Sequence, residues 1–358
     1  MKINEIPQDI LNNFRKGCVI PAHPLSLKED MSIDEQDMRA LANYYIDAGV
    51  GGIAIGVHTT QFEIRDEKID MLEDVLRFTS QSIDDICAKK GKGILKVSGI
   101  CGLTEQAVAE AKLAASLGFH ASLLNMSAFK DKTNDEKIAH CEAVAAEIPV
   151  IGFFLQSAIS GMSLDYDFWK RFAQIDNVLG IKMAPFNRYQ TIDVVRAICD
   201  AGKENDITLY TGNDDNIIMD LLSPYRFKTA RGVVEARVKG GLLGHWCVWT
   251  KKAVELLDEI HSIVDSGKDI PVEMLSRNIE VTDSNAVFFD AANNFHGCIP
   301  GIHEVLRRQG LMKSIRCLNP QETLSPGQLE EIDRVYKAYP HLHDDEFVQS
   351  HKQDWLSK

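Results

Sequence analysis

Basic residues are scarce in this sequence relative to acidic ones: 39 Lys and Arg stand against 52 Asp and Glu, a formal net charge of −13. Nucleic acids and anionic membrane surfaces attract basic proteins, so neither is expected as a partner. No hydrophobic run approaches the roughly 18 residues of a membrane span. Residues 1–16 also lack the apolar segment of a secretory signal. We therefore expect a cytoplasmic protein that binds neither membranes nor nucleic acid.

The cysteines form no C-x-x-C pair. Eight of them are scattered at positions 18, 87, 101, 141, 199, 247, 298 and 317. A chain of 358 residues that is 45% hydrophobic can bury enough apolar surface to fold without disulfide staples. We expect these cysteines to be reduced and packed in the core rather than to bind metal or act in catalysis.

What the sequence does contain is a regular alternation of strand-like and helix-like segments. Strands are expected at 17–22, 53–57, 93–100, 121–126, 150–155, 178–184, 207–211 and 242–248. Helices are expected at 32–48, 66–89, 104–117, 134–147, 165–174, 189–201, 214–222 and 250–264. Eight strand–helix pairs, repeating about every 30 residues, predict an α/β fold of the (β/α)8 TIM-barrel type. A doubly wound open sheet is the competing arrangement.

Segments outside this repeat complete the expected organisation. Residues 1–16 are predicted to form an N-terminal helical segment and residues 17–267 the barrel. Residues 268–358 are predicted to form a C-terminal helical extension. Within the barrel, the long connection 223–240 is expected to hold an added hairpin or a linker helix. Helices of the extension are expected at 286–294, 302–309 and 326–338.

One stretch carries an unusual charge. Asn177–Pro185 has the pattern of a short buried strand, and its one lysine, Lys182, lies near the C-terminal end. In one interpretation the stem of Lys182 lies on apolar surface while the ammonium reaches water. In the other, Lys182 is a desolvated amine with a lowered pKa that attacks a carbonyl group to form a Schiff base.

A barrel would place Lys182 among other polar groups. Functional groups of such barrels lie at the C-terminal ends of the strands. In this sequence those ends carry His23, His58, Thr59, Thr60, Asn125, Gln156, Lys182, Asn213, Asp214, Asp215, Gly244 and His245. The polar ring makes a reactive Lys182 about as plausible as a passive lysine at a strand end, and the residues alone leave both interpretations open.

Four stretches resemble one known family in their order and spacing. They are 48–53 running into Thr59-Thr60, 177–184 around Lys182, 211–215, and 240–244. Over residues 18–312 the chain is similar to the dihydrodipicolinate synthase and N-acetylneuraminate lyase superfamily of class I aldolases. The resemblance implies a barrel with a C-terminal helical extension, assembly as a homo-oligomer (dimer or tetramer), and no metal or other cofactor.

The same resemblance implies site roles. Lys182 corresponds to the family lysine that forms an imine with pyruvate or another 2-oxo acid. Thr59 and Thr60 correspond to the pair that holds the carboxylate of that acid. An iminium accepts electrons from the neighbouring carbon, which makes carbon–carbon cleavage, condensation or dehydration there easier. Hydroxyls and backbone amides that hold the carboxylate keep the substrate in register.

Departures from the family pattern are equally informative. The family places a catalytic tyrosine at the end of strand five, where this chain has Phe153-Phe154, and either phenylalanine could take that place. Residues 127–130 lack the second tyrosine of the synthases, and residues 157–161 lack the arginine that grips a distal carboxylate. The Gly-Glu that follows the threonine pair in the family is also replaced, by residues 61–63. These differences argue against dihydrodipicolinate synthesis itself.

Other groups could replace the missing hydroxyl or bind substrate. His58 and His245 titrate near neutral pH and are candidate general acids or bases, although each could equally be structural. Arg65 is a candidate clamp for a carboxylate, with a surface salt bridge as the alternative. The remaining candidates for substrate binding are Gln156, Asn213, Asp214 and Gly244, of which Asp214 could instead cap a helix.

The sequence therefore predicts a Schiff-base aldolase or lyase that acts on pyruvate or another 2-oxo acid, including sugar-derived ones. A dehydratase or hydro-lyase of the same family is the nearest alternative. A metal-dependent barrel enzyme would use His23, His58 and His245 together with Asp214 or Asp215. A non-catalytic sensor of 2-oxo acids, suggested by the lost tyrosines, is the third alternative.

Overall fold

The structure is a computed structural model that describes residues 1–357. Its centre is a barrel of eight parallel strands. The strands are β1 (Val19–Pro21), β2 (Gly52–Ile55), β3 (Leu95–Ile100), β4 (Ala121–Leu124), β5 (Val150–Leu155), β6 (Val178–Ala184), β7 (Thr208–Thr211) and β10 (Val238–Leu243). They pair in the order β1-β10-β7-β6-β5-β4-β3-β2. The barrel closes because Ala22 bridges Ala54 and the N–H of His23 donates to the Ala54 carbonyl at 2.7 Å. The barrel prediction is confirmed, and the open sheet is wrong.

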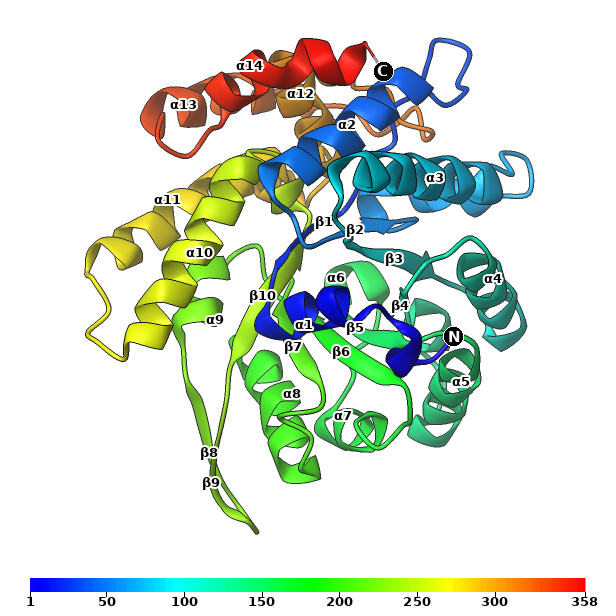
Figure 1. Cartoon of the computed structure of the whole chain (residues 1–358), viewed down its shortest axis with the longest axis vertical. Helices are drawn as coiled ribbons and strands as arrows, with labels where there is room; N and C mark the ends of the chain where they lie inside the picture. The colour runs from blue at the N-terminus through cyan, green and yellow to red at the C-terminus, as the bar shows by residue number, and fades with distance from the viewer. Residues whose placement is uncertain (358) are drawn as a thin grey trace.

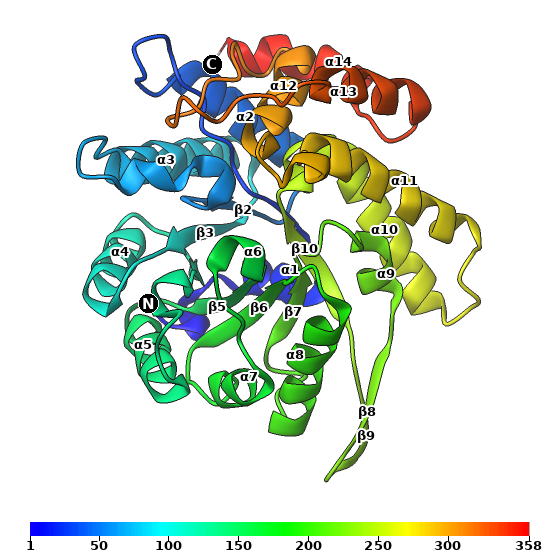
Figure 2. The same ribbon diagram turned by 180° about the vertical axis from the view of Figure 1, so that it is seen from behind.

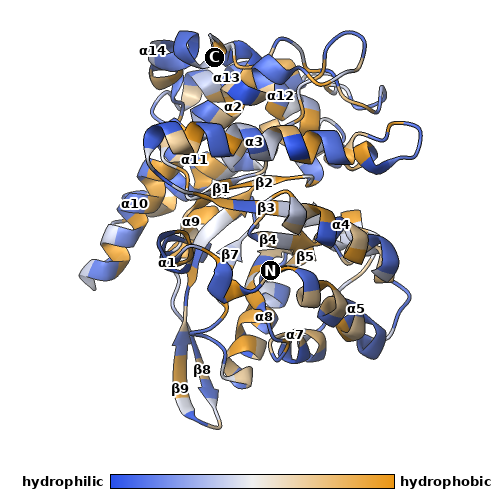
Figure 3. Ribbon diagram, turned by 45° about the vertical axis from the view of Figure 1, so that its right-hand side comes forward, coloured by the Kyte–Doolittle hydropathy of each residue, from blue (hydrophilic) through white to orange (hydrophobic). Residues whose placement is uncertain are grey.

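Helices surround this barrel (Figure 1). They are α2 (Glu35–Ala48), α3 (Leu72–Lys90), α4 (Thr104–Ser116), α5 (Asn134–Glu147), α7 (Tyr166–Phe172), α8 (Arg188–Ala201), α9 (Ile217–Leu222) and α10 (Thr250–Ser266). A further short helix, α6 (Ser157–Ser160), follows β5. Hydrophobic residues colour much of the central strands, while the exposed sides of helices such as α3 are hydrophilic (Figure 3). The strands are buried on both sides, as a parallel barrel requires.

The base of the barrel is covered by the N-terminal segment. This segment comprises the short turn η1 (Ile3–Glu5) and helix α1 (Gln8–Lys16), and α1 lies against β10 and β3. Phe14 stacks on Tyr210 with ring centroids 4.6 Å apart. The Tyr210 hydroxyl donates to the Phe14 carbonyl and accepts from the Cys18 N–H. The predicted N-terminal helix is therefore shorter than 1–16 but has a clear role in closing one end.

The C-terminal extension packs against helices α2 and α10 of the barrel. It consists of α11 (Glu273–Phe288), the turn η6 (Ala291–Asn293), α12 (Cys298–Gln309), α13 (Gln328–Ala338) and α14 (Asp345–Leu356). Figure 1 shows α12 to α14 above α2. Buried Asp344 joins these parts, because its carboxylate accepts from the Tyr44 hydroxyl, the Gln309 amide and the Lys251 N–H. The predicted helix 286–294 is wrong, since α11 ends at Phe288, and α14 was not expected.

The structure confirms one other expectation and corrects another. The connection 223–240 holds a hairpin of β8 (Tyr225–Thr229) and β9 (Gly232–Ala236), which projects from the barrel (Figures 1 and 2). The last barrel strand was predicted at 242–248 but ends at Leu243, because residues 245–247 form the tight turn η5 (His245–Cys247).

All eight cysteines are free, and seven are buried. No helix among residues 1–357 has the length and hydrophobicity needed to cross a membrane.

We predict that Phe14→Ala lowers the free energy of unfolding by about 3–5 kcal/mol, because it leaves a cavity under the barrel and removes the stacking on Tyr210. Chemical denaturation measures this change. Arg15→Ala, an exposed neighbour on the same helix, should change stability by less than about 0.5 kcal/mol. Equal effects of the two changes would contradict a closing role for Phe14.

Candidate active site

A pocket of about 200 Å³ lies inside the C-terminal end of the barrel. Its polar lining includes Lys182, His58, Thr59, Gln156 and Asp214, which come from the ends of different strands. The sequence predicted all five of these residues as site residues. One water molecule occupies about 30 Å³ in the liquid, so the pocket has room for a small organic acid. Gly244 also borders it.

Lys182 reaches this pocket from the middle of β6. Its side chain is 9% exposed, and Nζ lies 4.4 Å from the centroid of the Phe153 ring. The end of β7 is a glycine here for a steric reason: a Cβ on Gly212 would lie 2.5 Å from Cε of Lys182. Burial lowers the pKa of Lys182 to about 8, although the negative charge of Asp214 partly offsets that effect. The interpretation of Lys182 as a passive lysine with its ammonium in water does not fit this setting.

The phenylalanine beside the amine is Phe153 and not Phe154. Phe153 pairs with Lys182 across β5 and β6, and both side chains point into the barrel. Successive residues of a strand face opposite ways, so Phe154 points outward and packs on Trp169 with centroids 5.6 Å apart. The structure thus resolves the ambiguity that the sequence left: an aromatic ring without a hydroxyl faces Lys182.

Asp214 faces the same pocket from the loop after β7. Its Oδ1 accepts a hydrogen bond from the backbone N–H of His245 at 3.0 Å, and only 5% of the residue is exposed. Burial raises the pKa of Asp214 to about 7, while the His245 hydrogen bond and the charge of Lys182 act in the opposite direction. Burial thus disfavours the charged form of both members of this pair.

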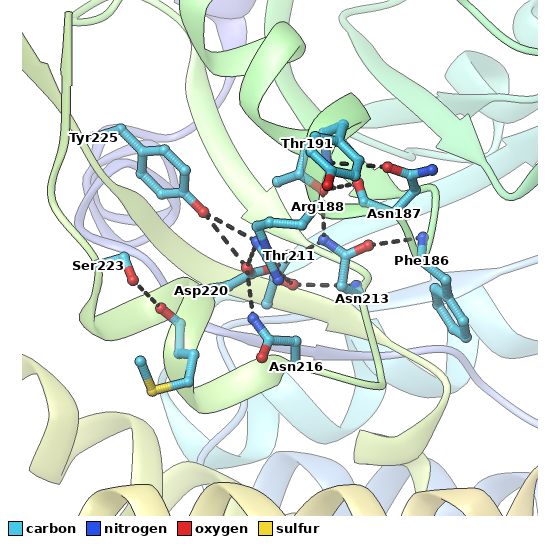
Figure 4. A network of polar contacts seen from close by, with 12 residues as sticks. Phe186, Asn187, Arg188, Thr191, Thr211, Asn213, Asn216, Asp220, Ser223 and Tyr225 are labelled. Atoms are coloured by element: carbon cyan, nitrogen blue, oxygen red, sulfur yellow. Dashed lines mark hydrogen bonds and ion pairs between the residues drawn. The ribbon is translucent and has the colours of Figure 1, made fainter.

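A buried polar network fixes the loop that carries Asp214 (Figure 4). At its centre is the fully buried Asp220 of α9, which accepts from Thr211 at 2.6 Å and from the Asn213 amide at 2.9 Å. Asp220 also forms an ion pair with Arg188. Asn213 donates to Thr191 as well and accepts from the Phe186 N–H. Asn213, expected to bind substrate, is turned into this network instead and positions the loop.

The threonine pair lies in the turn η2 (His58–Thr60) after β2. The Thr59 hydroxyl borders the pocket and donates to the Ala22 carbonyl at 2.7 Å. The Thr60 hydroxyl donates to the His23 carbonyl and accepts from the Gly56 N–H, so it holds the turn together rather than facing the pocket. Burial, aided by the positive charge of Lys182, lowers the pKa of His58 to about 4.

Two predicted residues have other surroundings. The imidazole of His245 stacks on Phe288, with centroids 5.9 Å apart, and lines a separate hollow between α10 and α11. Only its backbone reaches Asp214. Arg65 was expected to clamp a substrate carboxylate, but its guanidinium pairs with Glu110 at 3.1 Å and donates to the Gly99 carbonyl. This ion pair lies in the interior and ties the loop after β2 to α4, which corrects the expectation of a free clamp or a surface bridge.

The histidines proposed for a metal site are not brought together. His23 packs edge-on against Tyr45, His58 borders the barrel pocket, and His245 faces the other hollow. Within residues 1–357, no group of three or more His, Cys, Asp or Glu side chains is arranged to hold a metal ion. The alternative of a metal-dependent barrel enzyme therefore loses the ligand set on which it rested.

The C-terminal extension also contributes to the pocket, which the sequence did not predict. Phe289, Asn294, Phe295 and Cys298, from α12 and the chain that precedes it, line the mouth. Phe295 packs edge-on against Phe186, with centroids 6.1 Å apart. Phe186, which follows β6, adopts a φ of 50°, an unusual backbone for a residue of its size. The two aromatic side chains narrow the entrance, so the extension is part of the site rather than an appendage.

Comparison with known proteins agrees with this geometry. The model of the dihydrodipicolinate synthetase family matches residues 16–234, more than half of the chain. This chain belongs to that family. The crystal structure of a dihydrodipicolinate synthase from Acinetobacter baumannii, complexed with pyruvate, has a TM-score of 0.70 and 19% sequence identity to it. The match covers 90% of this chain and 98% of the bacterial one, and it shows a shared fold.

Two curated relatives are more similar in sequence but match only in part. A 4-hydroxy-tetrahydrodipicolinate synthase from Archaeoglobus fulgidus is 30% identical over 208 residues, which are 55% of this chain and 63% of the relative. An L-threo-3-deoxy-hexylosonate aldolase from Hypocrea jecorina is 31% identical over 180 residues, which are 46% of this chain and 53% of the relative. This member of the dihydrodipicolinate synthetase family thus spans less than two thirds of the length of each.

We predict that Lys182 of this family member reacts with acetic anhydride half-maximally near pH 8, because only the neutral amine is nucleophilic and burial lowers its pKa. An unperturbed lysine titrates near about 10.4. Competitive labelling over pH 6 to 11, read by peptide mass spectrometry, gives the titration curve. A midpoint at the ordinary lysine value would show that the pocket does not perturb the amine.

We predict that Asp220→Ala destabilises the protein by about 3–5 kcal/mol, because the change leaves Arg188 and the buried donors around it without their acceptor. Urea denaturation provides the measurement. Asp193→Ala, which breaks an exposed pair with Arg196, should cost no more than about 1 kcal/mol. A small effect of Asp220→Ala would mean that the network in Figure 4 does not hold the loop.

Proposed function

We propose that this chain is a class I aldolase, or a related carbon–oxygen lyase, that forms a Schiff base between Lys182 and pyruvate or another 2-oxo acid. The observation that carries the proposal is the buried amine of Lys182 inside a small pocket at the C-terminal end of the barrel, where burial lowers its pKa to about 8. A substantial fraction of this amine is neutral at physiological pH and can attack a ketone. The iminium that forms withdraws electrons from the adjacent carbon and so favours bond cleavage there.

The carboxylate of the substrate would lie against η2. Thr59 borders the pocket there, and His58 is next to it. Because the pKa of His58 is about 4, its imidazole is neutral at pH 7 and can donate one hydrogen bond without adding charge beside Lys182. Thr60 would act by holding the turn through its bonds to His23 and Gly56. In this orientation the ketone carbon of the acid would face Nζ.

Sugar-derived 2-oxo acids suit the remainder of the pocket better than the substrates of dihydrodipicolinate synthesis. Gln156 and Asn294 supply polar groups near the mouth, and Phe186, Phe289 and Phe295 bound it with apolar surface. Phe153 has no hydroxyl to offer where the resemblance implies a tyrosine. The similarity to an L-threo-3-deoxy-hexylosonate aldolase supports the same direction. Removal of water from a hydroxylated 2-oxo acid would use the same imine and is the nearest alternative.

We predict that sodium borohydride in the presence of pyruvate, or of other 2-oxo acids, traps a reduced adduct on Lys182. Peptide mass spectrometry locates the adduct, and the relative yields rank the substrates. Lys96 is a matched control within the same chain, because it is also buried but pairs with Asp84 outside the pocket.

The variant Lys182→Met should give no adduct while remaining folded. An adduct that forms equally on Lys96, or one that persists in the variant, would contradict the assignment. Absence of any adduct with all the 2-oxo acids tested would remove the support for the imine mechanism. Saturable binding without trapping or turnover would favour the sensor alternative.

A further inference from the structure

Imine chemistry needs a proton carrier beside Lys182. The hydroxyl of the first adduct leaves as water only after it receives a proton, and an enamine forms only when a base removes a proton from C3 of the substrate. Phe153, the residue closest to the amine on β5, has no titratable group. Another residue of the pocket must therefore move these protons.

Four titratable groups lie near the Lys182 amine or share its pocket: His58, Asp214, Cys247 and Cys298. His58 has a pKa of about 4, so it is a weak base and is hardly ever protonated at neutral pH. The Cys247 thiol donates to the Ala22 carbonyl at 2.7 Å, and burial raises its pKa to about 12. Burial also raises the pKa of Cys298 far above its ordinary value. None of these three groups both gains and loses a proton readily near pH 7.

Asp214 differs from them in geometry. It approaches the pocket from the loop after β7, whose Gly212 is in contact with the stem of Lys182. The His245 N–H holds Oδ1 at 3.0 Å, and the Asp220 network holds the neighbouring Asn213. Asp214 thus lines the same small pocket as the amine, and the hydrogen bond to Oδ1 holds its carboxyl group in place.

Resting on the proposed imine function, we propose that Asp214 is the catalytic acid and base of this site and takes the place of the missing phenolic hydroxyl. The neutral amine attacks C2 of the 2-oxo acid, and a proton moves from nitrogen to the former carbonyl oxygen. The Asp214 carboxylic acid then protonates that hydroxyl, the C–O bond breaks, and water leaves. The resulting carboxylate removes a proton from C3, which gives the enamine and regenerates the acid.

The resting pair needs only one shared proton for this cycle. Charged and titratable groups facing Asp214 are Lys182 from β6, Asp215 next to it, Cys247 from η5 and Cys298 from α12. Burial raises the pKa of Asp214 to about 7, and it lowers that of Lys182 to about 8. Burial therefore disfavours the charged form of both groups, which brings the neutral pair closer in energy to the ion pair.

Exchange of the pyruvate methyl protons in D2O tests this role without knowledge of the acceptor substrate. Loss of the methyl signal in ¹H NMR reports enamine formation by the whole chain. Wild-type protein should catalyse exchange, and Lys182→Met should not. Asp214→Asn should slow exchange by about 10²-fold or more, the usual contribution of a general acid–base group. Asp193→Asn, the same chemical change on the exposed side of α8, should exchange at the wild-type rate.

A second variant separates proton transfer from a structural role. Asp214→Ala leaves space for a small acid, so added formate should restore exchange in proportion to its concentration. Borohydride trapping of wild type reports the imine itself. No trapping and no exchange in wild type would overturn the imine function together with this proposal. Trapping and exchange in wild type, with exchange equally fast in Asp214→Asn or with no formate rescue of Asp214→Ala, would overturn the role of Asp214 alone.

Discussion

The chemistry proposed for this protein depends on the burial of one amine, that of Lys182. Moving the Lys182 ammonium out of water lowers its pKa from 10.5 to about 8, which corresponds to about 3 kcal/mol against the charged form. This shift is a net result, because the negative charge of Asp214 already offsets part of the desolvation of the ammonium. The π face of Phe153 lies 4.4 Å from Nζ. The balance leaves an amine that is neither permanently charged nor permanently neutral at physiological pH. A nucleophile that must both attack a carbonyl group and leave it again needs this property.

The surrounding fold encloses that amine and holds the groups next to it in position. Helix α1 fills the base of the barrel through Phe14, and the C-terminal extension narrows the mouth through Phe289 and Phe295. Between these ends, the Asp220 network holds the loop after β7. Gly212 has no side chain, so this loop can lie close to the stem of Lys182. None of these parts takes part in the reaction, but together they fix the positions of the reacting groups.

Much of the fold could be predicted because eight apolar runs alternate with amphipathic ones, and the lysine stood out because charge is rare in a buried strand. The errors arise where an apolar run is not a strand. The sequence of residues 245–248 suggests the end of the last strand, which would direct His245 into the barrel. The strand instead ends at Leu243, and the imidazole of His245 faces α11. Arg65 and Glu110 pair across 45 residues of sequence, which no local pattern reveals. The aromatic residues at the mouth depend in the same way on how the extension packs.

A crystal structure of the protein soaked with pyruvate tests the central claim most directly. The account predicts continuous electron density from Nζ of Lys182 to C2 of the acid, with the carboxylate against η2 and Phe153 beside the new bond. Pyruvate bound without a covalent link to Lys182, or bound outside the barrel pocket, would contradict it.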